Sequence, residues 1–121
     1  MKATSILHWT VRIAAALLLI SGAVVWTGSA DVLIPIHILL GVVLTIALLV
    51  LTYRGFAGGV ARGLVVGVLI VSLVLPVLGM TQSALVPESL AWVAQIVHLA
   101  LGLGAWALAE TLFLRLGKKG S

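Results

Sequence analysis

Five side chains that ionise or bind metals lie inside long apolar stretches of the sequence: His8, Arg12, His37, His98 and Glu110. Such side chains are costly to place in lipid, and those that persist there usually mark a functional site. His37 and His98 each precede an arginine by 17 residues, Arg54 and Arg115 respectively. This spacing corresponds to about 25 Å of helix. If both arginines mark one membrane interface, the two histidines lie at the same depth, in the opposite half of the membrane.

Two histidines at one depth on parallel helices can supply both axial ligands of a metal in a planar macrocycle. Each is followed four residues later by a glycine, which falls on the same helix face and leaves room for a flat ring. Gln95 shares the face of His98 and is placed to contact polar groups at the ring edge. The pattern predicts a metal site with cofactor-binding residues beside it: His37 and His98 as ligands, with Gly41, Gly102 and Gln95 around them.

The same residues also have plainer interpretations. Small residues on helix faces commonly serve close helix packing, and a single membrane histidine can be a hydrogen-bonded interior residue. Histidine beside a small residue also ligates the magnesium of (bacterio)chlorophyll. Sequence alone leaves a metal macrocycle, a pigment and simple packing open.

A second group of ionisable residues lies nearer the arginine-marked side. His8 is close to the start of the chain, Arg12 is one helical turn further on, and Glu110 precedes Arg115 by five residues. Arg12 and Glu110 are expected to pair, because pairing lowers the cost of placing both in lipid. One interpretation is a quinone-binding or proton-relay site. The other is a structural ion pair beside an interfacial histidine.

The composition places the chain in lipid. It is 63% hydrophobic and 8% charged, with a mean hydropathy of +1.35, whereas soluble domains are about a quarter charged. There are no cysteines, which excludes disulfides, iron–sulfur clusters and thiolate metal sites. The net charge is +4, but the basic residues sit at the ends of apolar runs. We therefore attribute them to membrane topology and expect no nucleic-acid partner.

Four apolar runs are long enough to cross a bilayer, which takes about 20 residues: roughly 6–26, 32–53, 61–80 and 89–114. Short turns rich in Gly, Ser and Thr are expected at 27–31, 54–59 and 81–84. Residues 1–121 are therefore predicted to form a single transmembrane domain, an all-α, integral membrane, antiparallel four-helix bundle. Pro35 and Pro87 suit the first turns of the second and fourth helices, and Pro76 should kink the third.

Charge asymmetry predicts the orientation of the bundle. With alternating spans, one side carries the basic residues Lys2, Arg54, Arg62, Arg115, Lys118 and Lys119. The acidic Asp31 and Glu88 fall on the other side. Because the positive side is cytoplasmic, both termini are expected inside (N-in/C-in). Arg12 would interrupt the apolar core of a secretory signal, so we expect the first run to be a retained span.

At these positions the sequence resembles the cytochrome b561-type membrane cytochromes, which include the cytochrome b subunits of formate dehydrogenases and hydrogenases. The resemblance covers most of the chain and rests on a few motifs: His8-Trp9 in the first run, His37-x-x-x-Gly41 and Tyr53-Arg54 in the second, and His98 in the fourth. Proteins of this type are four-helix bundles that bind two b haems.

The resemblance implies an outer haem between the second and fourth helices, with His37 and His98 as its ligands. It implies an inner haem between the first and fourth helices, for which His8 matches one ligand. The partner of His8 should fall about two heptads after His98, near Leu112, where the sequence has no histidine. We therefore expect one haem b, with His8 left over.

The resulting functional expectation is a membrane b-type cytochrome of the bacterial cytoplasmic (inner) membrane. It would carry out transmembrane or quinone-linked single-electron transfer, with a quinone or a redox protein as partner. It would act in a larger respiratory complex, as a homo-oligomer or alone; an oxidoreductase activity such as superoxide oxidation is compatible with the resemblance. The rival expectations are a (bacterio)chlorophyll-binding protein, a cofactor-free structural or assembly subunit, and a transporter.

Overall fold

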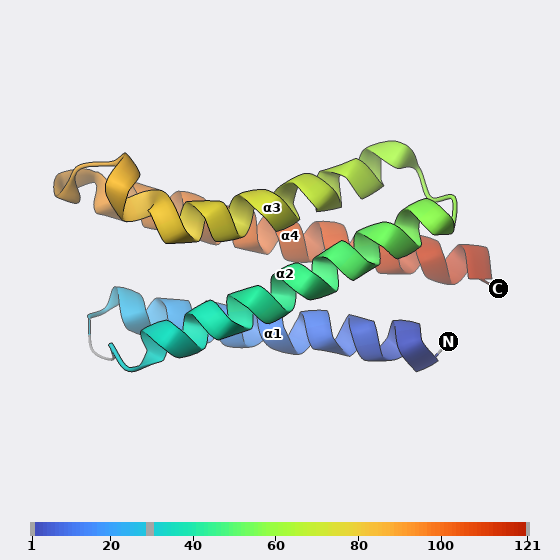
Figure 1. The fold of residues 1–121 in the computed structure, drawn as a ribbon, viewed down its shortest axis with the longest axis horizontal. Helices are drawn as coiled ribbons and strands as arrows, with labels where there is room; N and C mark the ends of the chain where they lie inside the picture. Colours follow the sequence, from blue (N-terminus) through green and yellow to red (C-terminus); the bar gives the residue numbers. More distant parts are fainter. Residues whose placement is uncertain (1, 29–30, 121) are drawn as a thin grey trace.

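The chain is almost entirely helical, as Figure 1 shows for a computed structural model. The structure describes residues 2–28 and 31–120. Over these residues the elements are α1 (Lys2–Trp26), α2 (Leu33–Ala57), α3 (Arg62–Leu85), the 3-10 turn η1 (Glu88–Leu90) and α4 (Ala91–Gly120). The four expected apolar runs thus all form helices, and all four are long and apolar enough to cross a membrane. This indicates a multi-pass membrane protein.

The expected turn at residues 81–84 is wrong, because α3 continues through these polar residues to Leu85. The Thr81 hydroxyl donates to the Val77 carbonyl (2.6 Å), so it is satisfied within the helix. The helix ends at Val86, which is extended (φ −131°, ψ 151°) because it precedes Pro87. Pro87 therefore ends α3 and leads into η1, rather than standing in the first turn of α4.

The connection between α2 and α3 is shorter than expected. α2 runs on past Arg54 to Ala57, and Gly58 donates its backbone N–H to the Arg54 carbonyl (2.8 Å). Gly59 follows with φ +70°, a left-handed conformation that favours glycine. The expected turn at 54–59 therefore begins only at Gly58. Pro35 lies in the first turn of α2, as predicted.

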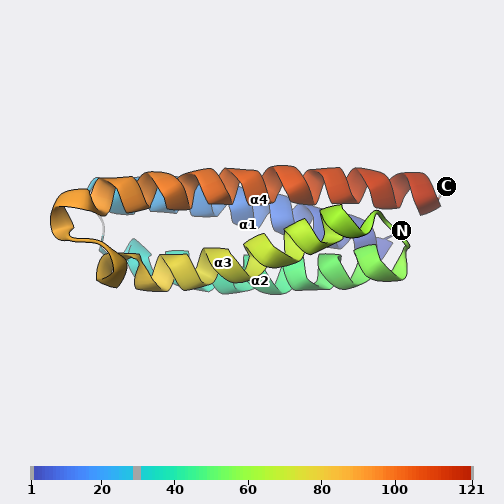
Figure 2. The same ribbon diagram turned by 90° about the horizontal axis from the view of Figure 1, so that it is seen from above.

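The helices form two layers. Figure 1 shows α1 beside α2 and α3 beside α4, and Figure 2 places α1 with α4 in one layer and α2 with α3 in the other. The helices that carry the two candidate ligands, α2 and α4, therefore stand at opposite corners. Both ends of the chain lie at the same end of the molecule, next to the connection between α2 and α3.

The buried core occupies the half of the molecule that contains the two termini. It consists of the core cluster Val11, Ala14, Leu44, Ala47, Leu48, Leu51, Val60, Val65, Val68, Ala109, Leu112 and Phe113. Toward the other end fewer side chains are buried; Ser21 and Ala94 are two that are. One half is thus filled by protein, whereas the half with His37 and His98 has little core of its own.

The outer surfaces of the helices are apolar. At most 22% of the residues in the most apolar window of any helix are buried inside the molecule. Large side chains such as Ile6, Val32, Leu39 and Leu114 are more than half exposed. Lipid is the environment that can cover so much apolar surface.

Candidate functional site: two histidines and an ionic cluster

His37 projects from the second turn of α2 toward α1, where its ring lies over a glycine. A Cβ atom added to Gly22 would stand 3.1 Å from His37 Cε1. The preceding residue, Ser21, is buried, and its Oγ lies 2.8 Å from His37 Nδ1. Gly22 and Ser21 therefore form the surface of α1 that contacts this imidazole. The sequence pattern singled out neither residue.

The Ser21 hydroxyl is the hydrogen-bond partner of His37 Nδ1. Ser21 Oγ also contacts the Leu18 carbonyl (3.3 Å), which only accepts hydrogen bonds. In the tautomer of His37 that carries its proton on Nδ1, that proton is donated to Ser21 Oγ, and the single hydroxyl proton of Ser21 is directed to Leu18. The neutral ring then carries its lone pair on Nε2, the form in which an imidazole can bind a metal.

His98 has a similar contact with a glycine in the second helix pair, α3 and α4. It projects from the third turn of α4, and a Cβ atom added to Gly79 of α3 would stand 3.1 Å from His98 Cε1. In each pair, a glycine on the first helix thus receives the imidazole of the second. The structure thus shows that Gly79 packs against His98.

The two imidazoles come from opposite corners of the bundle. Each histidine lies near the start of its helix, at the end of the molecule opposite the termini. Both imidazoles are half-buried. The structure therefore places His37 and His98 at the same end of the molecule, as the arginine spacing predicted.

Gly41 and Gly102 have open space around them. A Cβ atom added at either position would meet no other atom within 4 Å. Close helix packing, the plainer explanation for these glycines, is therefore not seen at these two positions. Gln95, the third residue expected beside the ligands, is half-buried and lies one turn before His98 in α4.

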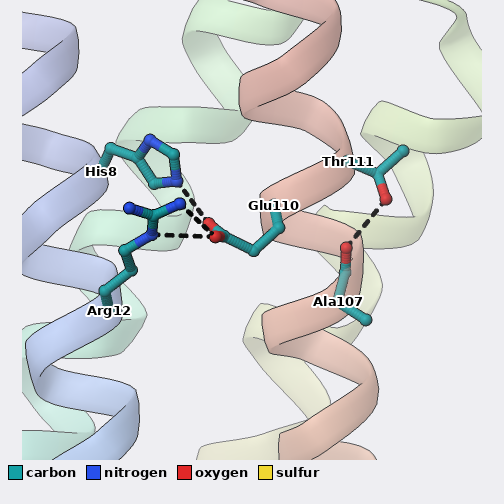
Figure 3. Close-up of polar contacts among 5 residues, drawn as sticks. All are labelled: His8, Arg12, Ala107, Glu110 and Thr111. Atoms are coloured by element: carbon teal, nitrogen blue, oxygen red, sulfur yellow. Dashed lines mark hydrogen bonds and ion pairs between the residues drawn. The ribbon is translucent and has the colours of Figure 1, made fainter.

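The second group forms an ionic cluster between α1 and α4 (Figure 3). Glu110 Oε1 accepts hydrogen bonds from Arg12 Nε (2.9 Å) and pairs with Arg12 Nη2 (2.8 Å). Glu110 Oε2 contacts His8 Nε2. The His8 ring stacks on Phe113, with ring centroids 4.0 Å apart, and the Arg12 guanidinium lies over the ring of Trp9. The expected pairing of Arg12 and Glu110 is present, and His8 joins it.

The ionic cluster is distant from the histidine site. Glu110 follows His98 by 12 residues on one helix, which corresponds to about 18 Å. The core cluster reaches the level of Glu110, since it includes Ala109, Leu112 and Phe113 in α4. Leu112, the position where the family resemblance would place a second inner ligand, is fully buried in that cluster. His8 is thus engaged by Glu110 and Phe113 and faces no second histidine.

The metal-ligating side chains of the histidine site limit the kinds of metal group that it can bind. Across residues 2–28 and 31–120, no three side chains among His, Cys, Asp and Glu gather in a way that could hold a bare metal ion. A metal within a macrocycle already has its equatorial ligands and needs only one or two axial ones. Two histidines as the donor set therefore fit such a group better than a free ion.

Comparison with known proteins adds no relative: no protein-family model, no curated protein and no solved structure matches the chain. The resemblance to the b561-type cytochromes thus rests on the motifs of the sequence itself.

Proposed function

We propose that this protein is a small membrane b-type cytochrome that holds one haem between His37 and His98 and passes single electrons between a quinone and a redox partner. The observation that carries the proposal is that the two imidazoles pack against their neighbouring helices in the same way. Each comes from one of two opposite helices, and each lies over a glycine of the neighbouring helix. In the tautomer of His37 that donates Nδ1–H to Ser21, Nε2 is free to coordinate.

The surroundings of the two histidines support a flat cofactor. The space around Gly41 and Gly102, one turn from each ligand, is open within 4 Å of an added Cβ. The buried core ends before this half of the molecule, so a large apolar group would replace missing packing there. Gln95 is then placed to bind the haem propionates. Haem bound by two histidines supplies a one-electron redox centre with no open coordination position.

A single haem is proposed because the inner half lacks both the ligand and the space for another. Leu112 is fully buried where a second ligand would be needed. His8 is held by Glu110, which also pairs with Arg12. The ionic cluster is better explained as a structural ion pair that connects α1 and α4 than as a quinone site. Both carboxylate oxygens of Glu110 already have partners, His8 and Arg12.

The proposed topology follows from the charges. The bundle is antiparallel, with both termini and the Arg54–Arg62 connection on the cytoplasmic side of a bacterial inner membrane. The two histidines then lie in the outer half of the membrane. An electron partner would approach the haem from the outer surface or from a quinone within the bilayer.

The test is a redox difference spectrum of the full-length protein purified in detergent. We expect the sharp α and β bands of a reduced b haem at one haem per chain. His37→Ala and His98→Ala should each abolish these bands, whereas His8→Ala, the matched control on α1, should retain them. A colourless wild-type protein would refute the proposal in favour of a cofactor-free subunit. A far-red band would refute it in favour of a chlorophyll-type pigment.

A further inference from the structure

Two buried polar atoms near His98 have no hydrogen-bond partner among the described residues: His98 Nδ1 and Gln82 Oε1. Buried polar atoms are nearly always paired, because an unpaired one loses its interaction with water without replacement. Two such atoms in one region of the protein therefore call for an explanation.

The two residues approach one another through Gly79. Gln82 follows Gly79 by three residues in α3, so both lie on the same face of that helix. The His98 ring lies directly over Gly79, with Nδ1 3.9 Å from the position of an added Cβ. The unpaired amide oxygen and the unpaired imidazole nitrogen therefore belong to adjoining turns of one interface.

The two atoms are chemically complementary. A carbonyl oxygen only accepts hydrogen bonds, and the Nδ1 of a neutral imidazole can carry the ring proton. In the first helix pair, the Nδ1 of His37 has a hydrogen-bond partner, the Ser21 hydroxyl of α1. The second helix pair has the same contact between a glycine and a histidine. Gln82 offers the acceptor that would give His98 Nδ1 a hydrogen-bond partner as well.

We propose that Gln82 is the positioning residue of His98. A rotation of the Gln82 side chain lets Oε1 accept the Nδ1–H of His98, which fixes the ring and leaves the lone pair on Nε2 for a metal. This inference rests on the proposed haem function. A hydrogen bond at Nδ1 makes an imidazole a more basic ligand, which favours the oxidised metal and lowers its midpoint potential.

The test is an optical redox titration of the purified, haem-containing full-length protein. Gln82→Met keeps the length of the side chain and removes the acceptor, so its midpoint potential should rise above that of the wild type. Thr81→Val is the matched control: it removes the neighbouring polar group, which bonds to Val77 within its own helix, and should leave the potential unchanged. Gln82→Glu retains an acceptor oxygen and should keep the wild-type ratio of haem to protein.

If Gln82→Met does not fold, Gln82→Asn replaces it. Asparagine draws the amide back toward the backbone by one methylene group, so the hydrogen bond to His98 should be lost and the same upward shift is expected. Haem-loaded variants with the wild-type potential would overturn the role of Gln82 and leave the haem assignment standing. A shift in Thr81→Val as large as that in Gln82→Met would also overturn it. A wild-type protein that purifies without haem would overturn the proposed function instead.

Discussion

The glycines around the two histidines offer a sharp test, because they fall into two classes in the structure. Gly22→Ala adds a methyl carbon 3.1 Å from His37 Cε1, whereas Gly41→Ala adds one that meets nothing within 4 Å. Both changes place alanine in the interior of a helix, so they share the same gain in helix propensity. The difference between the two variants therefore isolates the contact with the imidazole.

The magnitudes follow from these distances. Carbon atoms pack best at about 3.5–4.0 Å, so the His37 ring must move by roughly 0.4 Å in Gly22→Ala. Movement is restricted because His37 Nδ1 is bound to Ser21, the neighbour of the substituted residue. Overpacking of this kind lowers the free energy of unfolding by about 1–3 kcal/mol. The higher helix propensity of alanine raises it by about 1 kcal/mol in both variants. Gly41→Ala has no overpacking, so it should be the more stable variant by about 1–3 kcal/mol.

The assay compares unfolding in detergent and haem content for the two variants and the wild type. For protein produced without haem, we expect the stability order Gly41→Ala, wild type, Gly22→Ala. For protein produced with haem, Gly41→Ala should bind less than the wild type despite its greater stability, because the new methyl occupies space beside the proposed ring.

Two results would refute this reasoning. Equal stability of Gly22→Ala and Gly41→Ala without haem would show that the imidazole contact does not matter. Full haem content in Gly41→Ala would show that this helix face does not border the cofactor. Gly79→Ala and Gly102→Ala form the equivalent pair around His98 and should behave in the same way.

Three further predictions follow from the site and the ionic cluster. Ser21→Ala removes the acceptor for His37 Nδ1 and should weaken haem binding by about 10–100-fold without loss of the fold, as measured by haem titration; unchanged affinity would contradict the tautomer assignment. Glu110→Gln should lower the free energy of unfolding by about 1–3 kcal/mol, since Arg12 loses its ion pair in a partly exposed setting, while the haem spectrum stays intact; loss of haem would link the ionic cluster to the cofactor. Leu112→His should lower stability without adding a second haem, because this fully buried position has no spare volume; two haems per chain would show otherwise.

The sequence predicted the helices well because each apolar run is long enough to leave little choice. It predicted their ends less well. The polar residues 81–84 looked like a turn, but the Thr81 hydroxyl is satisfied within the helix, and Pro87 forces the chain out of it. Helix ends in this protein thus depend on backbone constraints at single residues more than on composition.

The candidate ligands were found by type and spacing, whereas their neighbours were not. His37 and His98 stand out because ionisable residues are rare within these helices. Gly22, Gly79 and Ser21 became visible only in the structure. The reason is that these helices are apolar on all sides, so the sequence does not fix how each is rotated against its neighbours. A contact between a glycine and a histidine depends on that rotation.

Each imidazole packs against a glycine of the helix that immediately precedes its own, a short distance away in the sequence: Gly22 with His37, and Gly79 with His98. Each of these contacts can therefore form as soon as one pair of helices has entered the membrane, before the other pair is made. A ligand that bridges the two histidines has to wait until both pairs have met. Its binding free energy then adds to the association of the two halves, so cofactor supply would control the last step in the biogenesis of this protein.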